Sequence, residues 1–328
     1  MSDTSAKNSL NVFAAGSVDN GNATQAIYWK NSAPVLLPPT TQANITGNSY
    51  GLSMAVSGND VYVAGFTSDG AGYWKNGNPT ILASRFAVVH AIAVSGNDVY
   101  LAGQDLVNGR QCAVYWKNGD RIILTDTSVS GMDEDATSIF IAGNDVYVCG
   151  RSFVPSIVAM KATYWKNGFP VILGNDLLTS SANFITVSGE DIYVSGFQNS
   201  NTSPAVYWKN GVAVSVTDGN GQVGITAIGV SGNDVYITGS EYNAATHTSF
   251  ALYWKNGQPT YLTAKNISSS VNCIAISGND VYMGGSTSSS ATSSNDMATY
   301  WANGVAVTLP YSANHGFQNV NAIVLTDK

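Results

Sequence analysis

The sequence has few charged residues and no cluster of basic ones. Only 11% of its 328 residues are charged, the formal net charge is −7, and no run of Lys or Arg occurs. A protein that binds nucleic acid through the phosphates needs a basic surface, which this composition does not supply. Nucleic acid is therefore not an expected partner.

Long hydrophobic stretches are also missing. No apolar run approaches the roughly 20 residues of a membrane-spanning helix, so no membrane span is expected. Met1 to Thr4 lead into polar residues rather than into the apolar part of a signal peptide. Low charge and abundant Ser, Thr and Asn favour an extracellular or cell-surface location, with the signal segment absent from this chain.

Cysteine is scarce, and its spacing fits no metal site. The three cysteines, Cys112, Cys149 and Cys273, are odd in number and form no CxxC pair. We therefore expect neither a disulfide framework nor zinc. Cys149 replaces the Ala of a recurring Val-Ala-Gly phrase, so it is expected to be a small buried residue without chemistry.

What the sequence does contain is one unit copied along its whole length. The phrase Ser-Gly-Asn-Asp-Val-Tyr occurs six times with small changes, and a second phrase, Tyr-Trp-Lys-Asn-Gly, follows it. All seven tryptophans lie in the second phrase, and the tyrosines before them are 45, 42, 49, 43, 46 and 47 residues apart. A period near 45 with short β segments is typical of propeller blades.

Each unit predicts four strands. In one copy we expect them at residues 91–95, 98–102, 113–117 and 121–124, with turns at Gly96-Asn97 and Asn118-Gly119. Gly-Asn suits a type II′ hairpin turn and Asn-Gly a type I′ turn. The first two strands are almost continuously apolar, which predicts burial on both faces of the sheet.

The two ends of the chain each carry part of a unit. Residues 11–16 match a second strand without its first, and residues 321–325 match a first strand after which the chain stops. The termini are expected to complete one blade together. The prediction is an all-β, seven-bladed β-propeller with four antiparallel strands per blade, forming a single domain over residues 1–328 with residues 1–7 as a disordered tail.

These phrases resemble those of seven-bladed β-propellers found in bacterial secreted or surface proteins, including surface lipoproteins. The resemblance covers residues 8–328 and implies the architecture. It carries over no catalytic residue.

The order of the strands places the two-residue turns on one face and the variable connections on the other. Variable loops on a rigid scaffold usually carry function. The Tyr-Trp pairs are expected to pack between blades, with stacking on sugars as the alternative if the rings are exposed. The recurring Asp and Lys near the turns are assigned a structural role.

The candidate ligand-binding residues depart from the repeat on the variable face, around the mouth of the channel. They are His90, Arg151, Glu241, His247 and His315. His90 aligns with a mostly polar set of residues in the other copies, which predicts a ring at the channel mouth. No two histidines have metal-ligand spacing, so no metal site is assigned. Asp218 begins a weak calcium-like motif without the downstream Glu, and no other cofactor is expected.

Three functions remain open at this point. The first is a non-enzymatic, monomeric extracellular binding module for a glycan or a protein partner. The second is a polysaccharide-acting enzyme, a lyase or glycoside hydrolase, with its site over the channel. The third is a structural or adhesive spacer. A propeller can serve as any of these, so the fold does not choose among them.

Overall fold

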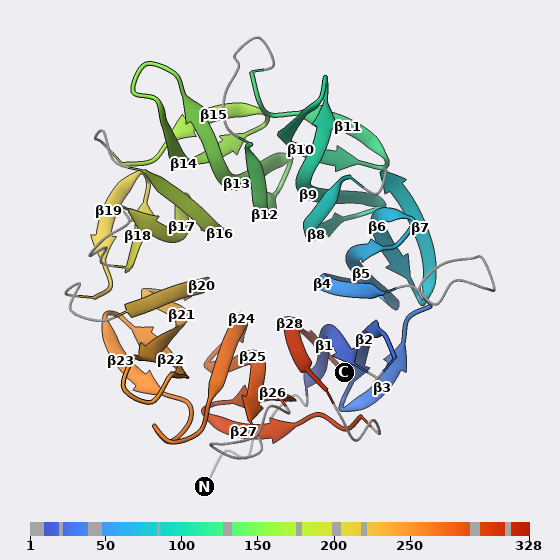
Figure 1. Cartoon of the computed structure of the whole chain (residues 1–328), viewed down its shortest axis with the longest axis vertical. Coiled ribbons are helices and arrows are strands. Elements are labelled where there is room, and N and C mark those ends of the chain that lie inside the picture. The colour runs from blue at the N-terminus through green and yellow to red at the C-terminus, as the bar shows by residue number, and fades with distance from the viewer. Residues whose placement is uncertain are drawn as a thin grey trace, which may run out of the picture.

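The chain folds into a ring of seven β-sheets. The computed structural model describes residues 10–19, 22–38, 48–83, 86–126, 133–174, 179–198, 205–217, 222–288, 296–311 and 316–328. Each sheet has four antiparallel strands and forms one blade of a β-propeller (Figure 1). The predicted fold class is confirmed. The described residues contain no helix that is long and apolar enough to cross a bilayer.

The strands of each blade run in order from the channel to the rim. Blade 1 contains β28 (Gln318–Asp327), β1 (Leu10–Asp19), β2 (Thr24–Lys30) and β3 (Ala33–Leu36), and blade 2 contains β4 (Ser49–Ser57), β5 (Asp60–Thr67), β6 (Gly70–Lys75) and β7 (Asn78–Ala83). Blade 3 contains β8 (Val88–Ser95), β9 (Asp98–Val107), β10 (Arg110–Lys117) and β11 (Asp120–Ile123), and blade 4 contains β12 (Asp135–Ala142), β13 (Asp145–Val154), β14 (Ala159–Lys166) and β15 (Phe169–Ile172). Blade 5 contains β16 (Ser180–Ser188), β17 (Asp191–Gln198), β18 (Ala205–Lys209) and β19 (Val212–Ser215). Blade 6 contains β20 (Gln222–Ser231), β21 (Asp234–Asn243), β22 (Thr248–Lys255) and β23 (Gln258–Tyr261), and blade 7 contains β24 (Ser269–Ser277), β25 (Asp280–Ser288), β26 (Asp296–Ala302) and β27 (Val305–Thr308).

The two-residue turns have the backbone geometry that their residues predict. Gly96 has a φ of 58°, as the first central residue of a type II′ turn requires. Asn118 and Gly119 have φ values of 53° and 94°, the paired positive values of a type I′ turn. These turns fix the register of the hairpins in blade 3.

The middle hairpin of blade 3 is longer than predicted. Strands β9 and β10 extend to Val107 and Arg110, where the sequence analysis expected them to end at Ala102 and begin at Ala113. The connection between them is a second Asn-Gly turn, Asn108–Gly109, with φ values of 52° and 81°. Because this turn is tight, the strands continue to pair up to it.

The termini close the ring by sharing blade 1. Strand β28 pairs antiparallel with β1 from Leu10 opposite Asp327 to Val18 opposite Gln318. Figure 1 shows β28, from the end of the chain, next to β1, from its beginning. Val320 and Ile323 of β28 are buried in the core that joins blades 7 and 1. The predicted closure is confirmed.

The core consists of apolar clusters between successive blades. One cluster, for example, joins Tyr62 and Ala64 of blade 2 to Leu101 and Trp116 of blade 3. None of the seven tryptophans exposes more than 4% of its surface. The rings therefore pack between blades, and a lectin that stacks sugars on exposed tryptophans of the repeat is ruled out.

Candidate functional site

Antiparallel strands place the connections of every blade alternately on two faces of the ring. We call the turn face the one that carries the two-residue turns, which in blade 3 are Gly96–Asn97 and Asn118–Gly119. The loop face carries the connections from the second to the third strand and from one blade to the next. Residues 124–134, between blades 3 and 4, are such a connection.

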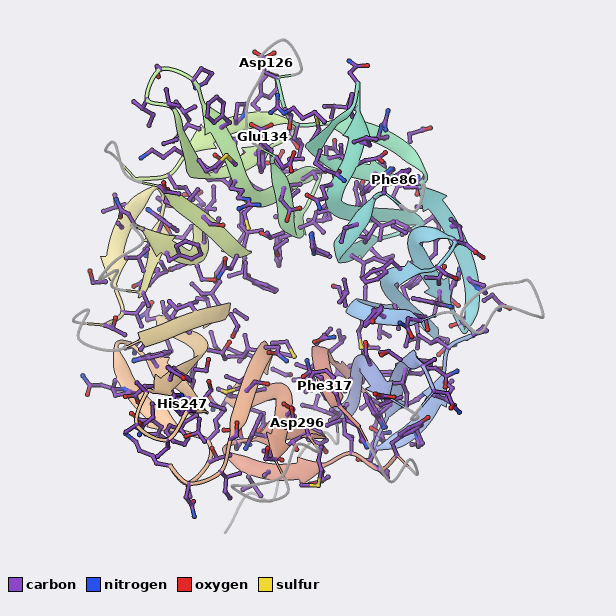
Figure 2. The ribbon with its side chains drawn as sticks, in the orientation of Figure 1. Phe86, Asp126, Glu134, His247, Asp296 and Phe317 are labelled. Atoms are coloured by element: carbon purple, nitrogen blue, oxygen red, sulfur yellow. The ribbon has the colours of Figure 1, made fainter. Side chains whose placement is uncertain are left out.

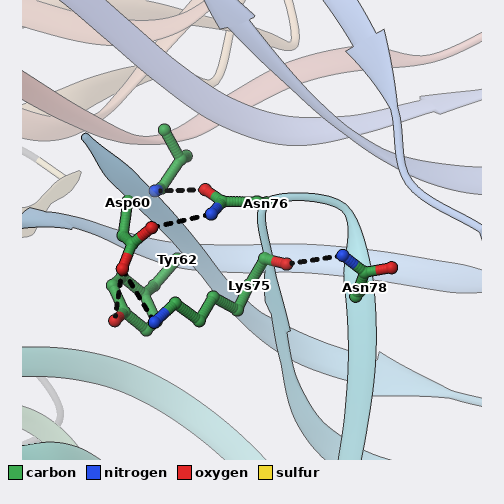
Figure 3. A network of polar contacts seen from close by, with 6 residues as sticks. Asp60, Tyr62, Lys75, Asn76 and Asn78 are labelled. Atoms are coloured by element: carbon green, nitrogen blue, oxygen red, sulfur yellow. Dashed lines mark hydrogen bonds and ion pairs between the residues drawn. The ribbon is translucent and has the colours of Figure 1, made fainter.

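The turn face carries one polar network that recurs from blade to blade. In blade 2, the Lys75 Nζ lies 2.7 Å from the Asp60 Oδ2, and the Asn76 Nδ2 donates to the Asp60 Oδ1 at 2.8 Å (Figure 3). The Asn76 Oδ1 accepts the N–H of Val61, which ties the turn to the start of β5. The Lys75 ammonium also lies 5.2 Å from the centre of the Tyr62 ring.

The ion pair of this turn-face network is present in blades 2 to 6. Its members are Asp60–Lys75, Asp98–Lys117, Asp145–Lys166, Asp191–Lys209 and Asp234–Lys255. Hydrogen bonds from Lys75 and Asn76 hold the pKa of Asp60 below its usual value. Recurrence in five blades with the same partners supports the structural role expected from the sequence.

A cleft of about 500 Å³ opens between blades 5 and 6 on the turn face. Its charged side chains are Asp191 and Lys209, which already form the ion pair of blade 5 at 2.7 Å. Asn256, also in its lining, accepts the N–H of Val235 and donates to Asp234. These groups do in the cleft what their equivalents do in other blades, so the cleft offers no distinctive chemistry.

At the channel mouth, the innermost strand of every blade has a β-bulge near the loop face. The bulged residues are Leu52, His90, Thr137, Asn183, Thr226, Asn272 and Asn321. These are the residues that the sequence aligned, and the predicted ring is confirmed. The Thr and Asn members donate to a backbone carbonyl of the next blade, as Thr137 does to Ala182 at 3.0 Å. Leu52 and His90, in adjacent blades, depart from this pattern.

His90 instead faces a carboxylate of blade 4. Its Nε2 lies 3.1 Å from the Oδ2 of Asp135, and both the His90 Nε2 and the Asp135 Oδ1 are buried without a hydrogen-bond partner. Arg151 lies directly opposite Asp135 in the ladder between β12 and β13, so both side chains leave the same face of the sheet. Arg151 is exposed and forms no ion pair with any described residue. We call these three residues the channel-mouth cluster.

His90 also lines a cavity in the channel. The cavity has a volume of about 240 Å³, and its lining includes Thr137, Asn272 and Asn321 of the bulge ring. His90 is the member of the channel-mouth cluster that lines this cavity, where further hydrogen-bonding groups surround it.

A second hollow lies between blades 3 and 4 toward the rim. This rim pocket has a volume of about 290 Å³, and its lining includes Arg110, Glu134, Phe153, Pro155 and Trp165. The Arg110 Nη2 lies 2.9 Å from the Glu134 Oε2, and both side chains are largely buried. The other carboxylate oxygen of Glu134 accepts the N–H of Phe153 at 2.6 Å. Figure 2 labels Glu134 over blade 4.

The indole of Trp165 lacks a contact that Trp29 and Trp74 make, and so do the indoles of Trp208 and Trp301. The indole N–H of Trp29 donates to the carbonyl of Pro310 at 3.0 Å, and that of Trp74 donates to the carbonyl of Pro38 at 2.7 Å. In each case the acceptor follows the outermost strand of the preceding blade. The Trp165 Nε1 is buried and has no hydrogen-bond partner.

Glu241 and His247 form a separate group on blade 6. Tyr261 donates a hydrogen bond to Glu241, and Lys265 lies 3.7 Å from the same carboxylate. His247 is exposed in the turn between β21 and β22, where its Nδ1 is 2.9 Å from the hydroxyl of Tyr242. Figure 2 shows His247 on blade 6, well separated around the ring from Glu134 beside blade 4. The structure thus places His90 and Arg151 each beside Asp135, but it places Glu241 and His247 elsewhere on the ring.

Two further predictions concern residues that the structure does not describe. His315, the fifth candidate residue, and Asp218, the start of the calcium-like motif, both lie outside the described residues. Among the described residues, no three His, Cys, Asp or Glu side chains are grouped so that they could hold a metal ion. The pKa of Cys149 is raised to about 12 by burial, so this thiol is a poor nucleophile.

The partners of the site could not be identified from the sequence. Asp135, Glu134 and Arg110 were visible as an acidic run and a nearby basic residue on the variable face, but no spacing linked them to His90 or Trp165. One signal was available at the position of His90. Five of the other copies have Thr or Asn there, so a histidine at this position indicates that its side chain has a different partner.

Comparison with known proteins leaves the family open. No protein-family model and no curated protein sequence matches the chain. Among solved structures, the β-propeller domain of the Trilobed protease from Pyrococcus furiosus is 12% identical, with a TM-score of 0.49 over 94% of this chain and 96% of that one. The acylaminoacyl peptidase of Pyrococcus horikoshii is 11% identical, with a TM-score of 0.49 over 94% of this chain and 51% of that one. A thermostable family-43 glycoside hydrolase is 12% identical, with a TM-score of 0.40 over 69% of this chain and 96% of that one. Likenesses this distant indicate no function.

Proposed function

We propose that this protein is a binding module that takes a glycan or a partner protein on its loop face, with the channel-mouth cluster as its principal contact. The observation that carries the proposal is the break in the bulge ring at His90. Five other ring members use their polar groups within the propeller. His90 and Asp135 lie close to each other, but the His90 Nε2 and the Asp135 Oδ1 are buried without a hydrogen-bond partner. A ligand that bonds to them removes the cost of leaving them unsatisfied.

A glycan fits this cluster better than an apolar ligand does. A sugar hydroxyl both donates and accepts, so one hydroxyl can serve Asp135 and another His90. The guanidinium of Arg151 presents several N–H donors in a plane, which suits adjacent oxygens. The seven inner strands line the channel as a rigid wall beside the cluster, and a few polar groups placed on such a scaffold are the usual geometry of a small-ligand site.

The test is retention on immobilised polysaccharides of different composition. Arg151→Ala and His90→Ala should each weaken retention by roughly 1–3 kcal/mol, about 5- to 150-fold, while the melting temperature stays nearly unchanged. Lys255→Ala on the turn face is the matched control and should bind normally. If retention depends on Glu241 and His247 and not on His90 or Arg151, the binding surface is blade 6 and this assignment is wrong.

One observation favours catalysis as a second candidate. A histidine next to a carboxylate is a common general base, and Arg151 lies on the same side of blade 4. On a uronate-containing polysaccharide, Arg151 would neutralise the sugar carboxylate while His90 took the proton next to it. The bond to the leaving sugar oxygen would break, a carbon–carbon double bond would form, and the oxygen would take a proton from water. New ultraviolet absorbance from that double bond supports the lyase, whereas retention of an unmodified glycan supports the binding module.

The outer strands support a monomeric module. In blades 1, 2, 4 and 6 the residue opposite the buried Trp in the outermost strand is proline, namely Pro34, Pro79, Pro170 and Pro259. Proline removes a backbone donor from the exposed edge and so hinders pairing with another chain. Light scattering after gel filtration should give the mass of one chain, and a stable dimer would contradict this part of the proposal.

The proposed location is extracellular or at the cell surface, as the resemblance to secreted and surface propellers implies. A surface with few charges and many Ser, Thr and Asn side chains is consistent with it. Protease digestion of intact cells is the test. Protection of the protein from the protease until the cells are broken would contradict this location, but it would not contradict the proposed binding site.

If the protein retains no glycan and no partner protein, the structural or adhesive spacer becomes the better description.

A further inference from the structure

We propose that the rim pocket is a second binding site, which takes one ring of a neutral saccharide with the Trp165 indole N–H as its hydrogen-bond donor. The pocket lies toward the outer strands of blades 3 and 4, away from the channel. Its lining and that of the channel cavity share no residue. The proposal for the rim pocket can therefore be tested separately from the proposal for the channel-mouth cluster.

The indole N–H of Trp165 is buried without a hydrogen-bond acceptor. Trp165 exposes only 1% of its surface, and its Nε1 has no partner, although Trp29 and Trp74 donate to backbone carbonyls from the equivalent position. A buried N–H without an acceptor is costly, and native structures usually satisfy it. Trp165 also lines the rim pocket, so an oxygen of a bound molecule can supply the missing acceptor once the side chains that cover the Nε1 move aside.

The charged residues in the lining of the rim pocket favour a neutral ligand. Arg110 and Glu134 form an ion pair in the lining, and Glu134 is held in place by the N–H of Phe153. A ligand with its own charge would compete with one member of this buried pair. Asp126 adds another carboxylate to the lining, which disfavours anions further. A neutral molecule with hydroxyl groups can donate to these carboxylates and leave the pair intact.

The apolar lining and the size of the rim pocket suit a single sugar ring. The remaining lining is largely apolar and includes Phe153, Pro155, Pro170 and Leu124. A pyranose ring has C–H faces that pack on such side chains and hydroxyls at its edge that reach polar groups. The volume of about 290 Å³ is near the lower limit of the roughly 300–1,000 Å³ of small-molecule sites, which suits one ring better than an extended chain.

The experiment observes the indole directly. The protein is labelled with ¹⁵N at its tryptophan side chains and titrated with the methyl glycosides of glucose, galactose, mannose and N-acetylglucosamine. We expect at least one of them to shift the Trp165 signal in a saturable way. Trp208 and Trp301 are the internal controls, since their indole nitrogens are also buried without partners, and their signals should not move.

A pair of matched variants identifies the donor. Trp165→Phe keeps an aromatic ring but removes the N–H, and it should weaken binding of the active glycoside about tenfold. Trp208→Phe makes the same change in blade 5 and should bind as the unmodified protein does. Arg151→Ala should leave the Trp165 response unchanged, which separates this site from the channel mouth. The titration of the unmodified protein needs no variant, so it remains decisive even if Trp165→Phe folds poorly.

Three results would overturn the assignment. The first is a Trp165 signal that responds to none of the four glycosides. The second is an equal response to glycerol, which would show that any small polyol suffices. The third is a stronger response to glucuronate or glucosamine, which would show that the site selects charge.

Discussion

The two faces of the ring are built from the same strands, yet they differ in how often their contacts recur. On the turn face the Asp–Lys pair is present in blades 2 to 6 with nearly the same distances, 2.7 to 2.9 Å. On the loop face, the junction of blades 3 and 4 holds contacts that the repeat does not specify, the His90–Asp135 and Arg110–Glu134 pairs.

This difference separates folding from function within one repeat. A contact that every blade can make adds to the stability of every blade, so its recurrence is explained by folding alone. A contact that departs from the repeat needs another reason, particularly where it leaves buried polar atoms without partners. Changes at recurring positions should therefore alter stability, and changes at the junction of blades 3 and 4 should alter binding.

The largest effect should come from removing the strand that closes the ring. Deletion of residues 319–328 takes away Val320 and Ile323, which are buried, at roughly 1.5–3 kcal/mol each. It also leaves the inner edge of β1 without its pairing strand, in a domain whose total stability is on the order of 5–15 kcal/mol. We expect loss of the cooperative thermal transition. Deletion of Lys328 alone is the control, and a truncated protein that melts like the full chain would mean that blade 1 does not need β28.

Two glycines of blade 3 should differ because they are present for different reasons. A Cβ on Gly103 would lie 1.9 Å from the carbonyl oxygen of Val88, so the backbone has to move, and Gly103→Ala should cost at least about 3 kcal/mol. A Cβ on Gly96 would meet no atom within 4 Å, and only its φ of 58° resists alanine. Gly96→Ala should cost about 1–2 kcal/mol. Urea unfolding of the two variants measures both, and equal costs would contradict this distinction.

The fold could be predicted from the sequence because its determinants are local and repeated. The Asn118-Gly119 turn, the apolar first strands and the partial units at the two ends each indicate the same architecture. The site could not be predicted in the same way, since it depends on the distance between side chains of different blades. Nothing near His90 in the sequence reveals that Asp135 faces it, and nothing near Trp165 reveals that its indole lacks the acceptor that Trp74 has.

A smaller effect is expected at the loop next to the rim pocket. Val158 is 73% exposed and has a φ of 51°, a conformation that a β-branched residue resists. Val158→Gly should relieve this strain and stabilise the protein by up to about 1 kcal/mol, as measured by urea unfolding. The equivalent change at Asn118, which tolerates a positive φ, should give no gain. If the proposed saccharide binds as well to Val158→Gly as to the unmodified protein, the strained loop has no part in that site.

The smallest effect should come from removing a single Asp–Lys pair of the turn face, and it is best measured as a change in the unfolding free energy at acidic pH. Hydrogen bonds from Asn118 and Lys117 lower the pKa of Asp98 in the folded protein. A carboxyl group whose pKa is lowered by folding stabilises the folded state above its unfolded pKa, near 4, and loses that contribution as the pH falls through its folded pKa. Removing the pair should therefore make the unfolding free energy less dependent on pH below about 4. Asp98→Asn should show this flatter dependence while its stability at neutral pH falls only slightly, because exposed ion pairs contribute little.

The same Asp–Lys pair occurs in five blades, so making the change in all five should render the unfolding free energy still less dependent on pH below about 4. Ligand binding on the loop face should remain intact in every variant. Loss of binding in the fivefold variant at neutral pH, with the fold preserved, would show that the turn face is not purely structural.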